Sequence, residues 1–369
     1  MRVLHFLTRS TWGGAQRVVH RLASDRPGSA VACAPGGRLV DRARAAGVPV
    51  HEQPHLRNAP GPLADSRALA DAVRLFRRER PDVVHCHSTK AGVVGRLAAG
   101  IVGLPTVFTV HGWGFSGVDG SPLEPALVGL ERHLAPRTDA VVLVSEHDLS
   151  EGRRRGILAE SDGTVVHNGI RPFAADGGRD TLAEEVGVGS GAVVGSVGRL
   201  AEQKDPLAVL RSGRALRDRG LDVETVLVGD GPLRRACERR VRGRPDQHVL
   251  GFREDARALL GAFDLLLLPS RFEGLPLVVL EAMHLGVPVV AYDVGGVAEA
   301  VSDGRTGAVV PPGDERALVD AAERLLCDPD RRERASEYAV TRARSRFPAD
   351  RMVGAYQQLY DRVRAGEFG

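Results

Sequence analysis

The sequence is poor in lysine, in cysteine and in long apolar runs, and each shortage excludes a class of protein. Only two of the 50 basic residues are lysines, Lys90 and Lys204. The four cysteines are scattered with no Cys-x-x-Cys pair, so neither a disulfide framework nor a zinc site is indicated. No apolar run approaches the roughly 20 residues of a membrane helix, and the opening run Val3–Leu7 is too short for a secretory signal. We therefore expect a cytoplasmic protein with at most peripheral contact with the inner face of the membrane.

Other absences narrow the function further. The net charge of +3 is too small to favour a nucleic-acid partner. A Gly-x-Gly-x-x-Gly fingerprint is missing, which argues against a dinucleotide-dependent oxidoreductase. The length of 369 residues is about twice that of a typical domain, so we expect two domains with separate cores.

Apolar strand patterns alternate with helical patterns along the chain, which predicts an α/β protein with two Rossmann-like parallel sheets. A Pro-, Asp- and Gly-rich segment, 171–191, is interpreted as the linker between the two series. The first domain's predicted strands are Val3–Leu7, Val83–His87, Thr106–Val110, Ala140–Val144 and Thr164–His167. The second domain's are Ala192–Val197, Glu224–Val228, His248–Leu250, Leu265–Leu268, Pro288–Ala291 and Ala308–Val310.

Glycines and cations follow the first strand of each predicted domain. Gly13 and Gly14 precede a helix, where backbone N–H groups and the helix dipole suit a phosphate; a plain tight turn explains them equally well. In the second domain, Gly198 is followed by Arg199 and then by Lys204. A guanidinium and an ammonium beside a glycine turn would suit a diphosphate, whereas the alternative is a solvated loop.

Two glutamates, Glu273 and Glu281, flank the start of a predicted helix after the apolar strand Leu265–Leu268. Their spacing does not place them on one face at short range, so they are not an acid–base dyad. They would reach different parts of one ligand, to which Leu277 and Val278 would point backbone N–H groups. A helix-start role would account for Glu273 but not for Glu281, a charge within an apolar helix.

Histidines stand at two strand ends. His111 follows Thr106–Val110 and is either a structural residue or a catalytic one. His85 and His87 share one face of a strand, but no third ligand is near in sequence, so we expect no metal there. The Asp328-Pro329-Asp330 segment has the letters of a metal-binding Asp-x-Asp motif, yet it lies between two late helices and is interpreted as turn and cap chemistry.

Lys90 lies at the start of the helix expected from about Thr89, which follows His85-Cys86-His87. In a chain so poor in lysine, its compact and mobile ammonium could contact the phosphates of a bound ligand or a second substrate. The alternative is a surface residue that caps nearby carbonyl groups.

Together these motifs resemble the retaining glycosyltransferases of family four, which have the GT-B architecture. The resemblance covers nearly the whole chain and looks like a bacterial exopolysaccharide or natural-product branch. Its most specific part is the E-x7-E spacing of Glu273 and Glu281. The motifs that carry it are Phe272-Glu273-Gly274-Leu275-Pro276, Glu281-Ala282-Met283, Gly286-Val287-Pro288, Gly295-Gly296-Val297-Ala298-Glu299, Gly198-Arg199-Leu200, Gln203-Lys204, Asn168-Gly169-Ile170 and Thr109-Val110-His111-Gly112-Trp113. Pro276 departs from the family pattern, since glycine is common at its position.

The resemblance also implies roles for single residues. Arg199 and Lys204 would bind the donor diphosphate and neutralise its charge as it leaves. Glu281 would bind the ribose hydroxyls, and Glu273 would contact the donor sugar or steady the charge at the anomeric carbon. His111 would lie against the donor sugar. The remaining implied donor contacts are those of Gly13 and Gly14 with the phosphates, and those of Phe252 and Arg253 with the base, mostly through backbone.

The resemblance implies two domains facing across a cleft: an acceptor-side domain over 1–171, a nucleotide-sugar-binding domain over 172–346, and a helix over 347–369 that crosses back to the first. The implied activity is retaining transfer of a hexose or N-acetylhexosamine, without metal ion or cofactor, from a UDP-sugar or GDP-sugar to a small-molecule or lipid-linked acceptor. A nucleotide-sugar epimerase of the same architecture and a catalytically inactive partner subunit are the alternatives. The epimerase lacks the E-x7-E context, and an inactive subunit would have lost members of the site.

Overall fold

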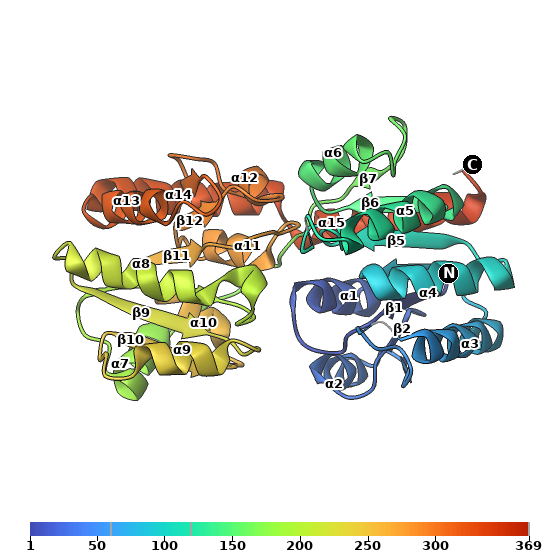
Figure 1. The fold of residues 1–369 in the computed structure, drawn as a ribbon, viewed down its shortest axis with the longest axis horizontal. Coiled ribbons are helices and arrows are strands. Elements are labelled where there is room, and N and C mark those ends of the chain that lie inside the picture. The colour runs from blue at the N-terminus through green and yellow to red at the C-terminus, as the bar shows by residue number, and fades with distance from the viewer. Residues whose placement is uncertain (60, 119, 368–369) are drawn as a thin grey trace. The chain divides into compact units, whose positions relative to one another are not determined.

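The chain forms two compact units in the computed structural model, which describes residues 1–59, 61–118 and 120–367 (Figure 1). One unit comprises residues 1–168 together with 350–369, and the other comprises residues 169–349. Each unit contains one parallel sheet, as the strand and helix alternation predicts.

The first unit is built on a seven-stranded parallel sheet with the order β3-β2-β1-β4-β5-β6-β7. The sequence analysis did not identify the short strands β2 and β3, and β7 ends two residues earlier than expected. The other predicted strands are found within a residue of their expected ends. The seven strands are β1 (Val3–Leu7), β2 (Ala30–Cys33), β3 (Val50–Glu52), β4 (Val83–His87), β5 (Thr106–Val110), β6 (Ala140–Leu143) and β7 (Thr164–Val165).

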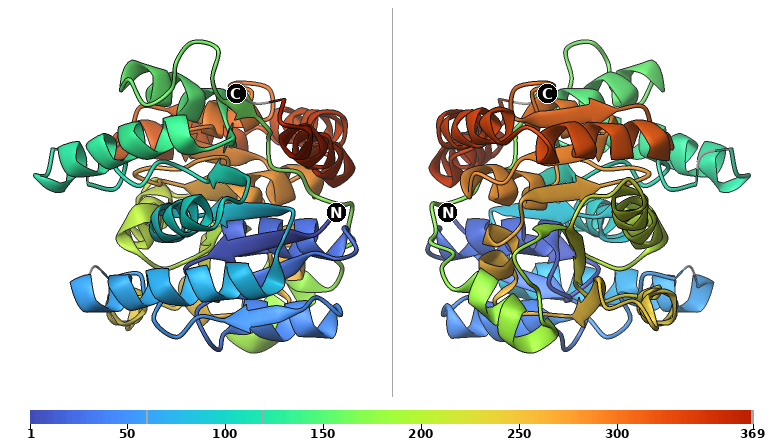
Figure 2. Two further views of the ribbon diagram at one scale, coloured as in Figure 1. Left: turned by 90° about the vertical axis from the view of Figure 1, so that its right-hand side faces the viewer. Right: turned by 90° about the vertical axis from the view of Figure 1, so that its left-hand side faces the viewer.

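Helices cover both faces of this sheet (Figure 2, left). Leu4 and Phe6 of β1 point into a core formed with α3, α4 and α5, whereas Leu7 points to the opposite face and packs with α1 and α2. This alternation is the two-residue period of a strand covered on both sides. The helices are α1 (Gly14–Ser24), α2 (Arg38–Ala45), α3 (Pro62–Glu79), α4 (Thr89–Val102), α5 (Leu123–Leu134) and α6 (Glu146–Arg154).

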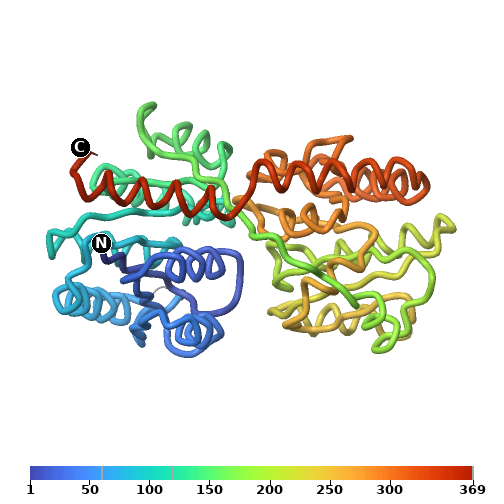
Figure 3. The backbone as a smooth tube through the Cα atoms, turned by 180° about the vertical axis from the view of Figure 1, so that it is seen from behind, coloured from blue at the N-terminus to red at the C-terminus, as the bar shows by residue number. Residues whose placement is uncertain are grey.

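The last helix, α15 (Ala349–Ala365), packs on the first unit, and the red end of the tube in Figure 3 follows it. Its apolar face is buried as the 3.6-residue period predicts. Two tyrosines of that face, Tyr356 and Tyr360, carry hydroxyl groups that form hydrogen bonds with side chains of β4 and β5.

The second unit is built on a six-stranded parallel sheet with the order β10-β9-β8-β11-β12-β13 (Figure 2, right). Every strand expected from the sequence is present, with ends within a residue of the expected ones. The strands are β8 (Ala192–Val197), β9 (Val223–Val228), β10 (Gln247–Gly251), β11 (Leu265–Leu268), β12 (Val289–Tyr292) and β13 (Gly307–Val310). The helices are α7 (Gly178–Val186), α8 (Pro206–Asp218), α9 (Arg234–Val241), α10 (Ala256–Gly261), α11 (Leu277–His284), α12 (Val297–Ala300), α13 (Glu315–Leu326) and α14 (Pro329–Arg346).

Side chains cap α6 and α14, and the second cap confirms the interpretation of the Asp328-Pro329-Asp330 segment. The Ser145 side chain accepts a hydrogen bond from the backbone N–H of Asp148 and so caps α6. The Asp328 carboxylate accepts a hydrogen bond from the backbone N–H of Arg331 and so caps α14. The first aspartate of the Asp-x-Asp segment is therefore a helix cap. Among the described helices, none has both the length and the apolar character needed to cross a membrane.

Candidate active site

In the second unit, the predicted cations and glutamates gather beyond the carboxyl ends of β8 and β11. The Lys204 ammonium donates a hydrogen bond to the Glu273 carboxylate. Glu273 is only 8% exposed, so its charge is buried, whereas its partner Lys204 is half-buried. A buried carboxylate is costly unless it is paired, and Lys204 supplies the pair.

Gln203 ties the loop after β8 to the loop after β11. Its side chain donates to the Phe272 carbonyl over 3.1 Å and accepts from Arg199 over 2.9 Å. Its own carbonyl accepts from the backbone N–H of Arg271 over 2.8 Å. Arg199 itself is exposed, so its guanidinium reaches solvent while Gln203 steadies it.

The loop after β12 packs tightly against Glu273. Gly295 has a φ of +56°, and a Cβ atom placed on it would lie 1.9 Å from the Glu273 carbonyl oxygen. The neighbouring Gly296 N–H donates to the Gly274 carbonyl over 2.7 Å. Only glycine allows this approach, and the contact fixes the backbone that carries the carboxylate.

Glu281 lies one helical turn inside α11 and is 3% exposed. It accepts a 2.7 Å hydrogen bond from Arg257, whose guanidinium stacks 4.2 Å above the ring of Phe173. The two glutamates therefore have different cationic partners, which agrees with their not being a dyad. Arg257 and Phe173 were missed by the sequence analysis, because neither belongs to a recognisable motif.

The other predicted donor contacts of the second unit also lie at strand and helix ends. α11 begins at Leu277, so Leu277 and Val278 occupy its first turn, where backbone N–H groups have no acceptor within the helix. Phe252 follows β10 and is half-buried. The side chain of Arg253 is engaged by Glu185 and Asp255, which hold the pKa of its guanidinium above the usual range through hydrogen bonds to Asp255 first and Glu185 second.

In the first unit, the glycine turn and His111 both follow strands at the carboxyl edge of the sheet. Gly13 precedes α1, and Gly14 is its first residue, so the free N–H groups of that helix lie directly after β1. His111 is half-buried after β5, and burial lowers the pKa of its imidazole to about 4. Ser88, between β4 and α4, has a φ of +69°, a strained conformation of the kind that concentrates at functional sites.

Lys90 is held inside the first unit. Its ammonium donates to the Asp65 carboxylate over 2.6 Å and to the Ala59 carbonyl over 3.5 Å. The ion pair and the carbonyl contact match the capping alternative, and a contact with acceptor or phosphate stays a prediction.

A third histidine joins His85 and His87, although none was near in sequence. His5 of β1 lies beside β4, and the three rings offer ligand atoms within 4.8 Å of one another. However, both ring nitrogens of His85 already have partners, the Tyr360 hydroxyl and the Thr109 hydroxyl, each at 2.7 Å. A metal ion would have to break these hydrogen bonds, so the geometry favours a polar network over a metal centre.

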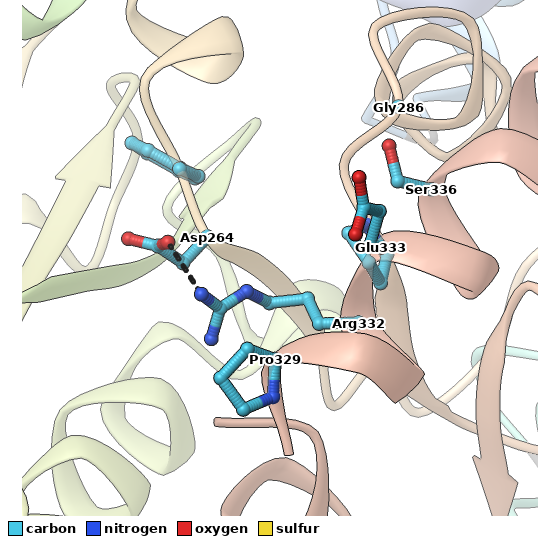
Figure 4. A pocket seen from close by; sticks show the side chains of 8 residues that line it. Asp264, Gly286, Pro329, Arg332, Glu333 and Ser336 are labelled. Atoms are coloured by element: carbon cyan, nitrogen blue, oxygen red, sulfur yellow. Dashed lines mark ion pairs between the residues drawn. The ribbon is translucent and has the colours of Figure 1, made fainter. Parts of the chain in front are cut away.

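A separate cavity lies elsewhere in the second unit. It measures about 360 Å³ and precedes β11 and β12, so it lies at the amino ends of these strands (Figure 4). An ion pair of 3.8 Å between Arg332 and Asp264 crosses it. None of the candidate residues lines this cavity, whereas ligands of open parallel sheets bind beyond the carboxyl ends.

Comparison with known proteins supports one family across both units. Residues 12–172 match the family model described as Glycosyltransferase Family 4, and residues 191–328 match that of Glycosyl transferases group 1. The chain is 32% identical to alpha-D-kanosaminyltransferase of Streptomyces kanamyceticus over 77% of its own length and 79% of that protein. It is 29% identical to UDP-Gal:alpha-D-GlcNAc-diphosphoundecaprenol alpha-1,3-galactosyltransferase of Escherichia coli over 72% of each chain.

Among solved structures, the chain superimposes on Anabaena HepE in complex with UDP-glucose with a TM-score of 0.85. The match covers 98% of this chain and 99% of HepE at 23% identity. This likeness shows that the two chains share a fold.

Proposed function

Because the chain belongs to the family 4 glycosyltransferases and has their GT-B fold, we propose that it transfers a sugar from a UDP-sugar to an acceptor hydroxyl with retention of configuration and without a metal ion. The observation that carries the proposal is the pairing of Lys204 with buried Glu273, beside Arg199 and beyond the strand ends. Such a preorganised group of charges suits a leaving diphosphate.

In the proposed reaction, Arg199 and Lys204 bind the donor diphosphate. The bond between the anomeric carbon and the phosphate oxygen breaks as a bond to the acceptor oxygen forms on the same face. The leaving phosphate takes the acceptor proton, so no enzyme nucleophile is needed. Glu273 and His111 contact the donor sugar, and Glu281 binds the ribose hydroxyls.

A UDP-sugar is the proposed donor because the Escherichia coli relative is named for UDP-Gal and the Anabaena structure holds UDP-glucose. The named relatives offer two kinds of acceptor, a lipid-linked sugar diphosphate and a natural-product precursor. We place the reaction in the cytoplasm, at the membrane face if the acceptor is lipid-linked.

The test is turnover by the purified protein with a panel of UDP- and GDP-sugars and both kinds of acceptor, followed by mass spectrometry of the products. Transfer from a UDP-sugar supports the proposal, whereas epimerisation of the donor or no reaction with any donor contradicts it.

The metal-free mechanism has its own test in the same assay. Transfer should continue in excess chelator, because the two cations supply the positive charge. Loss of activity with chelator and recovery with magnesium or manganese would contradict this part alone.

A further inference from the structure

A buried polar strip crosses one face of the first unit's sheet. Alternate residues of β4 and β5, Cys86 and Phe108, face the main apolar core. Their neighbours His85, His87 and Thr109 face the other way. Together with His5 of β1 they are 0% exposed, and α15 covers them.

Three of the histidines form one line of hydrogen bonds that ends at His111. Nδ1 of His5 lies 3.2 Å from Nε2 of His87, and Nδ1 of His87 lies 3.1 Å from Nε2 of His111. His85 belongs to a separate line, which runs from Tyr360 through His85 and Thr109 to Tyr356.

All three rings of the first line are neutral near pH 7. Burial lowers the pKa of His5 to about 3, with help from the charge of Arg26, and it lowers that of His111 to about 4. The pKa of His87 also lies well below its usual value, chiefly because of burial. A neutral imidazole has one donor and one acceptor nitrogen, so the line has only two consistent patterns. Either every Nδ1 carries the proton, or every Nε2 does.

The far end of the line decides between the two patterns. Within the described ranges, Nε2 of His5 is buried and has no hydrogen-bond partner. An orphaned buried N–H group is rarer in proteins than an orphaned acceptor. This argument favours the pattern in which every Nδ1 carries the proton, because the orphaned Nε2 of His5 is then an acceptor.

We propose that His5 and His87 are positioning residues that hold His111 as its Nδ1-protonated tautomer, so that His111 presents an N–H donor to an oxygen of the donor sugar. Nδ1 of His111 has no hydrogen-bond partner within the described part of the chain and is available for this contact. The inference rests on the proposed function for its substrate, but the tautomer is a property of the protein alone.

The direct test is long-range ¹H–¹⁵N NMR of the free wild-type protein at pH 7, with the His111 signals identified by their loss in His111→Gln. Protonation at Nδ1 of His5, His87 and His111 is expected. Protonation of His111 at Nε2 would overturn the proposal, whether or not the protein transfers sugar. Failure of transfer, in contrast, would count against the proposed function only.

Matched variants test the link to activity. His87→Phe should release His111 into mixed tautomers and lower kcat/KM roughly tenfold, mainly through kcat. His85→Phe, equally buried on the same strand, should lower the Tm comparably but leave the His111 tautomer and the kinetics unchanged. Equal kinetic losses in both variants would mean a merely structural role and overturn the proposal.

His5 has its own pair of variants. His5→Phe removes the donor to His87, whereas His5→Asn keeps an amide that can donate from the same position. The proposal expects His5→Asn to retain more of kcat than His5→Phe does, and the reverse order would contradict it.

Discussion

Arg199 and Lys204 are the residues on which the proposed chemistry depends most. Lys204 is already paired with Glu273, so its ammonium group is positioned before any ligand arrives. Replacing either cation with Ala should lower kcat roughly a hundredfold, the scale of losing one preorganised donor. Steady-state kinetics check this, with Arg240→Ala, an exposed arginine of α9, as the matched control. Similar losses in all three variants would contradict a specific role.

A different prediction concerns Glu281, because its carboxylate is proposed to bind the ribose hydroxyls. Glu281→Ala should weaken donor binding roughly tenfold or more, the range for a hydrogen bond to a charged group. Wild-type protein should discriminate against a 2′-deoxyribose donor, and the variant should lose most of that discrimination. Binding calorimetry measures both effects, with the exposed Glu337→Ala as control. Equal discrimination in wild type and variant would show that Glu281 does not read the ribose.

Single residues also show which parts of the site could be predicted from the sequence and which could not. The motif residues Glu273 and Lys204 could be chosen from their places after strands, and the structure brings them into contact. Arg257 could not be predicted from the sequence, because it reaches Glu281 from a separate segment that contains no recognisable motif. Lys90 was chosen for its rarity, a signal that does not specify a partner; the structure gives it Asp65.

At the scale of elements, strands that carry an apolar run and end in a polar turn were predictable. β1, β4 and β5 match their expected bounds, and α4 begins at Thr89 as expected. β2 and β3 have only four and three residues, too few for a periodic signal. The meeting of His5 with His87 depends on β1 pairing with β4 across some 80 residues, which no local pattern contains.

The buried histidines of β1 and β4 predict a pH-dependent stability of the first unit. The pKa of His5 is lowered to about 3, and those of His85 and His87 lie well below their usual value, in each case chiefly through burial. The unfolded chain binds these protons near pH 6.5 and the folded unit does not, so stability is present above pH 6.5 and is lost as the pH falls. Each histidine should cost about 1.4 kcal/mol per pH unit below that value.

Tryptophan fluorescence can follow this loss, because both tryptophans, Trp12 and Trp113, belong to the first unit. The Tm reported by fluorescence should fall steeply from pH 7 to pH 5, before carboxylates begin to titrate. His5→Phe should show a shallower fall than wild type. A flat profile in the wild type would contradict the buried neutral state of the cluster.

At the scale of the whole molecule, the fold class was predictable because both halves repeat the strand–helix alternation of parallel sheets. The family followed from the E-x7-E segment and its companions, and both family models confirm it. Neither the sequence motifs nor the family models identify the acceptor, because the acceptor-side loops contain no motif that specifies a ligand.

The central claim is retaining sugar transfer, and the configuration of the new linkage tests it most directly. The purified protein is supplied with the UDP-sugar that it turns over, and the product linkage is assigned by NMR from the coupling constants of the anomeric carbon and proton. Front-face substitution predicts that the product keeps the anomeric configuration of the donor. An inverted anomeric centre would contradict the account.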